Sequence, residues 1–198
     1  MHVIIDYQVG NLKSVQEGFK RAGINTIISN DIKVIQQATS LILPGVGAFE
    51  ASMQALKQSG LIPYIVDHIQ HNKYLLGICL GMQLLYEASE EFGYHQGLGI
   101  LKGVIKKIPD HVTVPHMGWN TLDIINKDPI FKHVKNDRDV YFVHSYYADS
   151  KDGLLATTTH GVTIPAIVKK GNVYATQFHP EKSGDVGHQL LLGYGDLI

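Results

Sequence analysis

The only cysteine of the chain, Cys79, lies in the pentapeptide GICLG at 77–81. An apolar run precedes it and a helical pattern follows it, so we expect the cysteine at a strand-to-helix turn. This is the thiol form of the Gly-x-Ser-x-Gly elbow, in which a sharp turn exposes a nucleophile. The flanking glycines leave room for a strained backbone and a closely approaching substrate, and the start of a helix favours the thiolate. The pattern alone leaves a small, buried, unreactive cysteine equally open.

A histidine and a glutamate near the other end of the chain could complete this chemistry. The sequence QFHPE occupies 177–181 and places His179 at the end of an expected strand. In open α/β sheets, sites form at the carboxyl ends of strands, where Cys79 is also expected. Pro180 disfavours helical geometry at His179, and Glu181 can accept a proton from one imidazole nitrogen, leaving the other for the thiol. Since the chain has eleven histidines, an ordinary surface turn is the alternative for this motif by itself.

A nucleophile that attacks a carbonyl also needs donors for the developing oxyanion. The backbone amide of Leu80, directly after the nucleophile, is one expected donor. The loop PGVG at 44–47 follows an expected strand, and its glycines let the chain turn an amide inward. An ordinary strand-to-helix loop is the alternative for this stretch.

The elements that must position these residues alternate between strand and helix through the first half of the chain. Continuous apolar strands are typical of a parallel sheet that is covered on both faces. Expected strands are His2–Asp6, Ile24–Ser29, Ser40–Leu43 and Tyr74–Ile78; expected helices run from Asn11 to Gly23, around Ala48–Lys57, over Leu61–Gln70 and over Leu80–Ala88.

The second half of the chain changes character, because short strand patterns follow one another with few helices between them. They are Lys102–Ile108, Trp119–Ile124, Val140–Val143, Leu154–Thr159, Ala166–Lys170 and Val173–Phe178, and a helix from about Gly184 closes the chain. The pattern predicts one α/β domain over 1–198, with a mixed, mostly parallel central sheet flanked by helices and an antiparallel extension.

Composition narrows the function classes. The chain has 198 residues, 44% of them hydrophobic, and a net charge of −1, which favours a globular protein with a sizeable core and argues against a nucleic-acid binder. Its apolar runs are too short to cross a bilayer, and Met1–Asp6 has no secretion signal, so a cytoplasmic protein is expected. One cysteine excludes an internal disulfide and a multi-cysteine metal site. No nucleotide-binding motif is readable. We therefore expect neither a metal nor a cofactor.

Taken together, Cys79, His179, Glu181 and the elbow at Gly77–Gly81 resemble the triad of the class I glutamine amidotransferases, over nearly the whole chain. The resemblance implies a flavodoxin-like α/β fold and an enzyme that hydrolyses glutamine to glutamate and passes the ammonia to a synthase. By position, it implies that Cys79 is the nucleophile, His179 the acid/base and Glu181 its orienting partner. It also implies an oxyanion hole at Gly47 and Leu80, and glutamine contacts from Gln83, His144, Ser145 and Tyr146.

Five segments are similar to the glutaminase subunits of imidazole glycerol phosphate synthases. They are PGVGAF at 44–49, GICLGMQ at 77–83, PHMGWN at 115–120, YFVHSYY at 141–147 and QFHPEKS at 177–183. This resemblance implies a heterodimer with a cyclase subunit, a (β/α)₈ barrel, in histidine biosynthesis. Positions that match the cyclase-facing surface are Gly10, Asn11, Met117, Trp119, Tyr141 and Lys182. Core packing is the alternative for Trp119. The tail from Gly187 to Ile198 matches no pattern closely.

Three other functions remain open. The related glutaminases of anthranilate and aminodeoxychorismate synthesis usually carry histidine where this chain has Met82, and the pyridoxal phosphate glutaminase has a different elbow. A cysteine peptidase or related hydrolase could share the elbow, and a non-catalytic module could share the fold. Because free ammonia is largely protonated at neutral pH, a glutaminase without its own acceptor site is best explained by a docked synthase.

Overall fold

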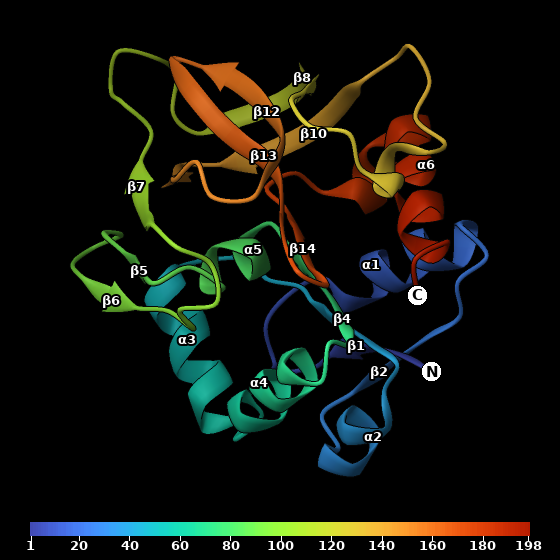
Figure 1. Cartoon of the computed structure of the whole chain (residues 1–198). Helices are drawn as coiled ribbons and strands as arrows, with labels where there is room; N and C mark the ends of the chain where they lie inside the picture. The colour runs from blue at the N-terminus through green and yellow to red at the C-terminus, as the bar shows by residue number, and fades with distance from the viewer.

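A computed structural model describes all 198 residues, and its centre is an eight-stranded sheet in the order β2-β1-β3-β4-β14-β13-β12-β9 (Figure 1). Strands β2 to β14 in this order pair in parallel, and the last three pair antiparallel. The predicted fold class is therefore confirmed. The strands span Thr26–Ser29 (β2), His2–Ile5 (β1), Ser40–Leu43 (β3), Tyr74–Ile78 (β4), Val173–Thr176 (β14), Val162–Lys170 (β13), Leu154–His160 (β12) and Asp123–Ile124 (β9).

Helices cover both faces of the parallel half of this sheet. The residues of β1 alternate between the two covers: Val3 and Ile5 pack into the core beneath α2, α3 and α4, and Ile4 packs beneath α1 and α6. This alternation is the two-residue period of a strand that is buried on both faces. The helices span Leu12–Arg21 (α1), Ile32–Gln37 (α2), Phe49–Gln58 (α3), Ile62–Gln70 (α4), Leu80–Leu84 (α5) and Gly184–Gly195 (α6), with 3₁₀ turns at Pro129–Phe131 (η1) and Pro180–Lys182 (η2).

The signals at both ends of α1 act as predicted. Asn11 is the N-cap, and its side-chain oxygen accepts a hydrogen bond from the Ser14 amide at 3.3 Å. Gly23, with φ of +76°, follows the last turn, where a residue with a side chain would be strained. None of the helices combines the length and apolar character needed to cross a membrane.

Two small sheets form the rest of the extension: in Figure 1, one lies at the top beside β12 and β13, and the other lies at the left of the main sheet. Strand β8 (His116–Thr121) pairs antiparallel with β10 (Asp139–His144). The second sheet has the order β11-β7-β5-β6, with bounds Tyr146–Asp149, Val104–Lys107, Ala88–Ser89 and His95–Gln96.

Three element predictions are wrong in their bounds. The strand expected over Ala166–Lys170 begins four residues earlier, at Val162. The helix expected over Leu80–Ala88 ends at Leu84, and Ala88 instead lies in β5. It ends because the carbonyls of Leu84 and Leu85 accept hydrogen bonds from the amides of Leu98 and Ile100 in place of a further helical turn.

The strand expected over Trp119–Ile124 divides into β8 and β9. Between the two strands, buried Leu122 donates its amide to the Arg138 carbonyl, and β9 pairs with β12 instead of β10. The sequence does not predict the helix α2 or the strands β6 and β11.

Candidate active site

Cys79 occupies the predicted elbow between β4 and α5. Its φ of +54° and ψ of −113° are rare for a residue with a side chain, and such strain persists only where the surroundings impose it. The Cys79 amide donates to the Thr176 carbonyl of β14 at 2.7 Å, which ties the elbow to the neighbouring strand.

The glycines around the elbow let the protein pack closely against itself. A Cβ on Gly81 would overlap the carbonyl oxygen of Leu43, and one on Gly77 would lie 2.9 Å from a methyl carbon of Leu85. Their role in this structure is therefore the tight turn itself, and the expected space for an approaching substrate lies on the other side of the cysteine.

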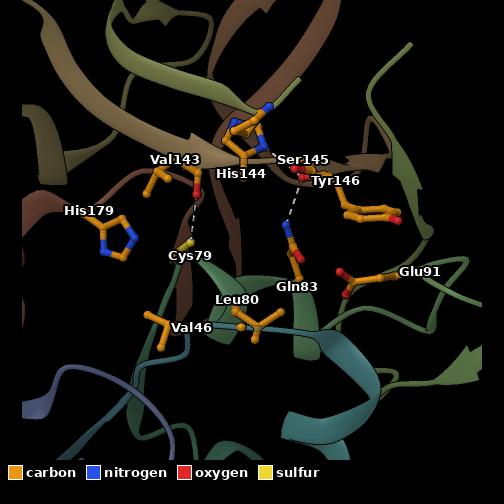
Figure 2. A pocket seen from close by; sticks show the side chains of 12 residues that line it. Val46, Cys79, Leu80, Gln83, Glu91, Val143, His144, Ser145, Tyr146 and His179 are labelled. Atoms are coloured by element: carbon orange, nitrogen blue, oxygen red, sulfur yellow. Dashed lines mark hydrogen bonds between the residues drawn. The ribbon is translucent and has the colours of Figure 1, made fainter. Parts of the chain in front are cut away.

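His179 and Glu181 meet as predicted. Nδ1 of His179 lies 2.8 Å from Oε1 of Glu181, and both side chains are almost completely buried. Strands β4 and β14 are parallel neighbours, so Cys79 and His179 reach the same edge of the sheet although they lie far apart in the sequence. Figure 2 shows the imidazole of His179 directed toward the sulfur of Cys79.

The electrostatics of this group favour a protonated imidazole. Burial lowers the pKa of His179, but the interactions with Cys79 and Glu181 outweigh it and raise the pKa to about 9. Oε2 of Glu181 is buried without a hydrogen-bond partner. Arg21 donates to the backbone carbonyl of Glu181 at 2.8 Å and not to its carboxylate. The carboxylate is therefore directed toward the imidazole alone.

A cavity of about 350 Å³ opens beside the cysteine and the histidine (Figure 2). It brings together all the residues predicted for the oxyanion hole and for glutamine contacts. The twelve lining residues are Val46, Gly47, Cys79, Leu80, Gln83, Glu91, Pro115, Val143, His144, Ser145, Tyr146 and His179. Glu181 lies behind His179 and does not line the cavity.

The loop PGVG at 44–47, which is predicted to supply an oxyanion donor, has a fixed part and an open part. Buried Tyr7 donates its hydroxyl to the Pro44 carbonyl at 2.7 Å, and a Cβ on Gly45 would lie 2.8 Å from the Gly81 amide nitrogen. By contrast, Gly47 has φ of +95° and open space where a Cβ would be. The conformational freedom of the backbone that was predicted for the whole loop is thus limited to Val46 and Gly47. On the opposite side, Leu80 begins α5, and its amide has no carbonyl in the preceding helical turn.

Two polar side chains define the far end of the cavity. Gln83 donates from Nε2 to the Tyr146 carbonyl at 2.9 Å and to Oε1 of Gln177 at 3.0 Å. Both amide hydrogens are thereby used, and the Gln83 side-chain oxygen is left as an acceptor. Glu91, which the sequence prediction missed, lines the cavity and accepts the Phe49 amide at 2.6 Å. The prediction missed Glu91 because it continued the helix through Ala88, where the chain instead enters strand β5.

His144 lies at the cavity, but its ring nitrogens are engaged elsewhere. Nδ1 lies 2.8 Å from the Tyr146 carbonyl, and Nε2 lies 3.0 Å from Nδ1 of His116. Burial is the main cause that lowers the pKa of His144 to about 3. The ring therefore has no free nitrogen to offer as a substitute for His179.

Four of the six residues expected at a partner surface are exposed, and Gly10 and Tyr141 are half-buried. Met117 and Trp119 are 65% and 58% exposed, so the core-packing alternative for Trp119 is wrong. Its ring packs edge-on against Tyr141, with the centroids 6.0 Å apart. Asn11 and Lys182 are also exposed. No cluster of three or more metal-ligating side chains is present.

The comparisons with known proteins agree with this geometry. The family model for glutamine amidotransferase class-I matches residues 3–193. The imidazole glycerol phosphate synthase subunit HisH of Oceanobacillus iheyensis is 50% identical over 200 residues, with 100% of each chain covered. The same subunit of Lactococcus lactis is 49% identical over 194 residues, covering 97% of this chain and 96% of that one.

Solved structures match the fold at low sequence identity. A glutamine amidotransferase structure superposes with a TM-score of 0.73 at 19% identity, covering 98% of both chains. PurLQS from Thermotoga maritima superposes with a TM-score of 0.75 at 16% identity, covering 99% of this chain and 97% of that one. The elbow, the buried histidine–glutamate pair and the match along almost the full length lead to one conclusion: the chain belongs to the class-I glutamine amidotransferase family.

Proposed function

We propose that residues 1–198 act as one glutaminase domain, the subunit of imidazole glycerol phosphate synthase that hydrolyses L-glutamine to L-glutamate and ammonia. The observation that carries the proposal is the Cys79–His179–Glu181 arrangement at a 350 Å³ cavity. It is supported by relatives that are named as this subunit and share 49–50% sequence identity with the chain over almost its full length. The reaction belongs to histidine biosynthesis, in the cytoplasm.

The chemistry follows from the side chains at the cavity. The Cys79 thiol gives its proton to His179, and its sulfur attacks the side-chain amide carbon of glutamine, with the oxyanion bound by the amides of Leu80 and the Val46–Gly47 segment. Protonated His179 gives its proton to the leaving nitrogen, and ammonia departs. His179 then takes a proton from water, whose oxygen attacks the thioester to release glutamate. Glu181 keeps the imidazole oriented and stabilises its charged form.

The far end of the cavity suits the amino-acid part of glutamine. The Glu91 carboxylate and the free Gln83 oxygen are both acceptors, as an α-ammonium group requires. Ser145 and the backbone of the His144–Tyr146 segment, on the opposite wall, are placed to bind the α-carboxylate. We therefore assign the reactive end of glutamine to Cys79 and its charged end to the Gln83–Glu91 side.

A partner that receives the ammonia fits the surface beside the cavity. We propose that Asn11, Met117, Trp119, Tyr141 and Lys182 contact the cyclase subunit in a heterodimer. An exposed aromatic residue is a typical anchor of such an interface. The open Val46–Gly47 peptides allow docking to favour the conformation with the donor turned inward. Loss of one oxyanion donor slows acyl chemistry by roughly a hundred- to a thousand-fold, so the isolated chain should be a poor glutaminase.

Cys79→Ala in the complex with the cyclase subunit tests the assignment. Glutamate release should disappear, because no neighbouring thiol can form the acyl intermediate. Synthesis of imidazole glycerol phosphate from added ammonium salt should persist, which controls for folding and assembly. Retained glutamine hydrolysis in this variant would refute the role of Cys79. Loss of the ammonia-driven reaction as well would place the defect in assembly.

A further inference from the structure

A chain of hydrogen bonds runs from strand β8 into the cavity, and its direction can be determined from both ends. At the outer end, Oδ1 of Asn120 accepts the Thr121 amide at 2.9 Å, and its Nδ2 donates to the Thr159 carbonyl at 3.0 Å. These two backbone groups fix which side-chain atom is nitrogen. The second Nδ2 hydrogen then points at Nε2 of His116, 3.1 Å away, which must be an acceptor.

The inner end imposes its own direction. Nδ1 of His144 lies 2.8 Å from the Tyr146 carbonyl. A carbonyl can only accept, so His144 carries its proton on Nδ1, and its Nε2 is an acceptor. The group that faces this Nε2 is Nδ1 of His116, at 3.0 Å, which must therefore donate.

The two deductions agree at His116. The outer end requires an acceptor at Nε2, the inner end requires a donor at Nδ1, and one neutral tautomer satisfies both. Each bond then has one donor and one acceptor: Asn120 donates to His116, His116 donates to His144, and His144 donates to the Tyr146 carbonyl. Stacking also holds the His116 ring, between Phe142 at 4.7 Å and His160 at 4.3 Å.

The environment keeps both imidazoles neutral. Burial is the main cause that lowers the pKa of His116 to about 4, and the electrostatic effect of the nearby His160 imidazole adds to it. Burial lowers the pKa of His144 to about 3; the Tyr146 carbonyl opposes this effect, and electrostatic interactions with the nearby imidazoles of His116, His160 and His179 add to it. A second proton on His144 would place two donors face to face at the 3.0 Å contact with His116, and a second proton on His116 would do so at its 3.1 Å contact with Asn120.

We propose that His116 and Asn120 are positioning residues of the glutaminase site, which form with His144 a relay of fixed direction that holds the Tyr146 carbonyl in place. That carbonyl also accepts the Gln83 amide, so the relay orients the side chain whose free oxygen faces the substrate. The inference rests on the proposed function. Side chains alternate along β8. The relay residues His116 and Asn120 therefore lie on its inner face, and the exposed residues Met117 and Trp119 lie on its outer face. One strand thus serves both the pocket and the proposed partner surface.

Nitrogen-15 NMR of histidine-labelled full-length chain tests the relay without reference to activity. His116 and His144 should both show a protonated Nδ1 and an unprotonated Nε2, unchanged from pH 8 to pH 5.5. In His116→Phe, which keeps the stacking but removes both hydrogen bonds, the Nε2 signal of His144 should shift. His116→Asn, which restores a donor near the Nδ1 position, should return it toward the wild-type value. Finding either histidine protonated on Nε2 over this range in the wild type would overturn the proposal.

Kinetics of the complex then separates positioning from chemistry. His116→Phe should raise KM for glutamine about threefold to tenfold, the equivalent of one neutral hydrogen bond, with kcat within about twofold. The matched control is His160→Phe, which keeps an aromatic ring stacked on His116 but removes the bond to the Thr113 carbonyl, outside the relay. It should leave both KM and the His144 signal unchanged. A fall in kcat at constant KM in His116→Phe would contradict a positioning role. A wild-type complex that releases no glutamate would count against the proposed function, and the NMR result would still decide the relay.

Discussion

Glu181→Gln isolates the charge that holds His179. The substitution preserves the size of the side chain and keeps an oxygen that can accept from Nδ1, so the 2.8 Å contact can survive. It removes the negative charge, which has no other hydrogen-bonding side chain near it, since Oε2 is unpartnered and Arg21 binds only the backbone carbonyl. The variant therefore changes the electrostatics of the triad with little change in its shape.

The magnitude follows from the kind of bond that is lost. A buried hydrogen bond to a charged group contributes about 1.5–3 kcal/mol, which corresponds to a roughly tenfold to 150-fold slower reaction if the whole contribution is felt in the transition state. We expect kcat for glutamate release in the complex to fall by this factor and KM to change little. The pKa of His179, about 9 in the wild type, should also fall, because Glu181 is one of the groups that raise it.

The sign of the pH effect on stability follows from the same pKa. His179 has a higher pKa in the folded chain than its ordinary value of 6.5, so its protonation stabilises the folded state fully below about pH 6.5. This contribution is lost as the pH rises through about 9. Denaturant unfolding between these pH values should show a smaller decline for Glu181→Gln than for the wild type.

Glu17→Gln on the exposed face of α1 is the matched control and should behave as the wild type. A loss of less than twofold in Glu181→Gln, with unchanged dependence on pH, would show that the carboxylate does not support the imidazole. An equal loss in Glu17→Gln would show that the effect is not specific to the triad.

Three further substitutions test the parts around the triad. Tyr7→Phe leaves the buried Pro44 carbonyl without its donor and should lower the free energy of unfolding by about 1–3 kcal/mol in denaturant titrations; an unchanged stability would count against the fixed part of the loop. Gly81→Ala places a methyl group against the Leu43 carbonyl and should lower the free energy of unfolding by about 1–3 kcal/mol in the same assay. An unchanged free energy of unfolding would mean that the elbow can relax. Trp119→Ala should weaken the stimulation of glutamate release by the cyclase subunit and leave the basal rate of the isolated chain unchanged; full stimulation would exclude this face from the interface.

The main features of the fold could be predicted because the local sequence patterns agree with the contacts that the same segments make in the folded protein. Tyr74–Ile78 is a continuous apolar run in the sequence and a fully covered strand in the sheet. Asn11 and Gly23 delimit α1 through their own backbone and side-chain preferences. The elbow was predictable for the same reason, since its two glycines and its cysteine lie within the five consecutive residues 77–81.

The features that escaped prediction depend on contacts between distant segments. Strands β5 and β6 have two residues each, too few for a periodic pattern, and Glu91 reaches the cavity only because they reverse the chain there. The His116–His144 bond exists because β8 and β10 pair in a register that places these residues opposite each other. Nothing in the sequence around either histidine specifies that register.

The junction of β4 with β14 also determines when the active site can exist during folding. The Cys79 amide is bonded to Thr176 across this junction, so Cys79 and His179 become neighbours only when two segments that are distant in the sequence have closed a very long loop. Such contacts form slowly. Recovery of thiol reactivity toward a glutamine analogue after dilution from denaturant should therefore lag behind the return of helical circular dichroism. In the native protein, the amide of Cys79 should exchange with solvent only through global opening, while those of Val46 and Gly47 exchange through local fluctuations.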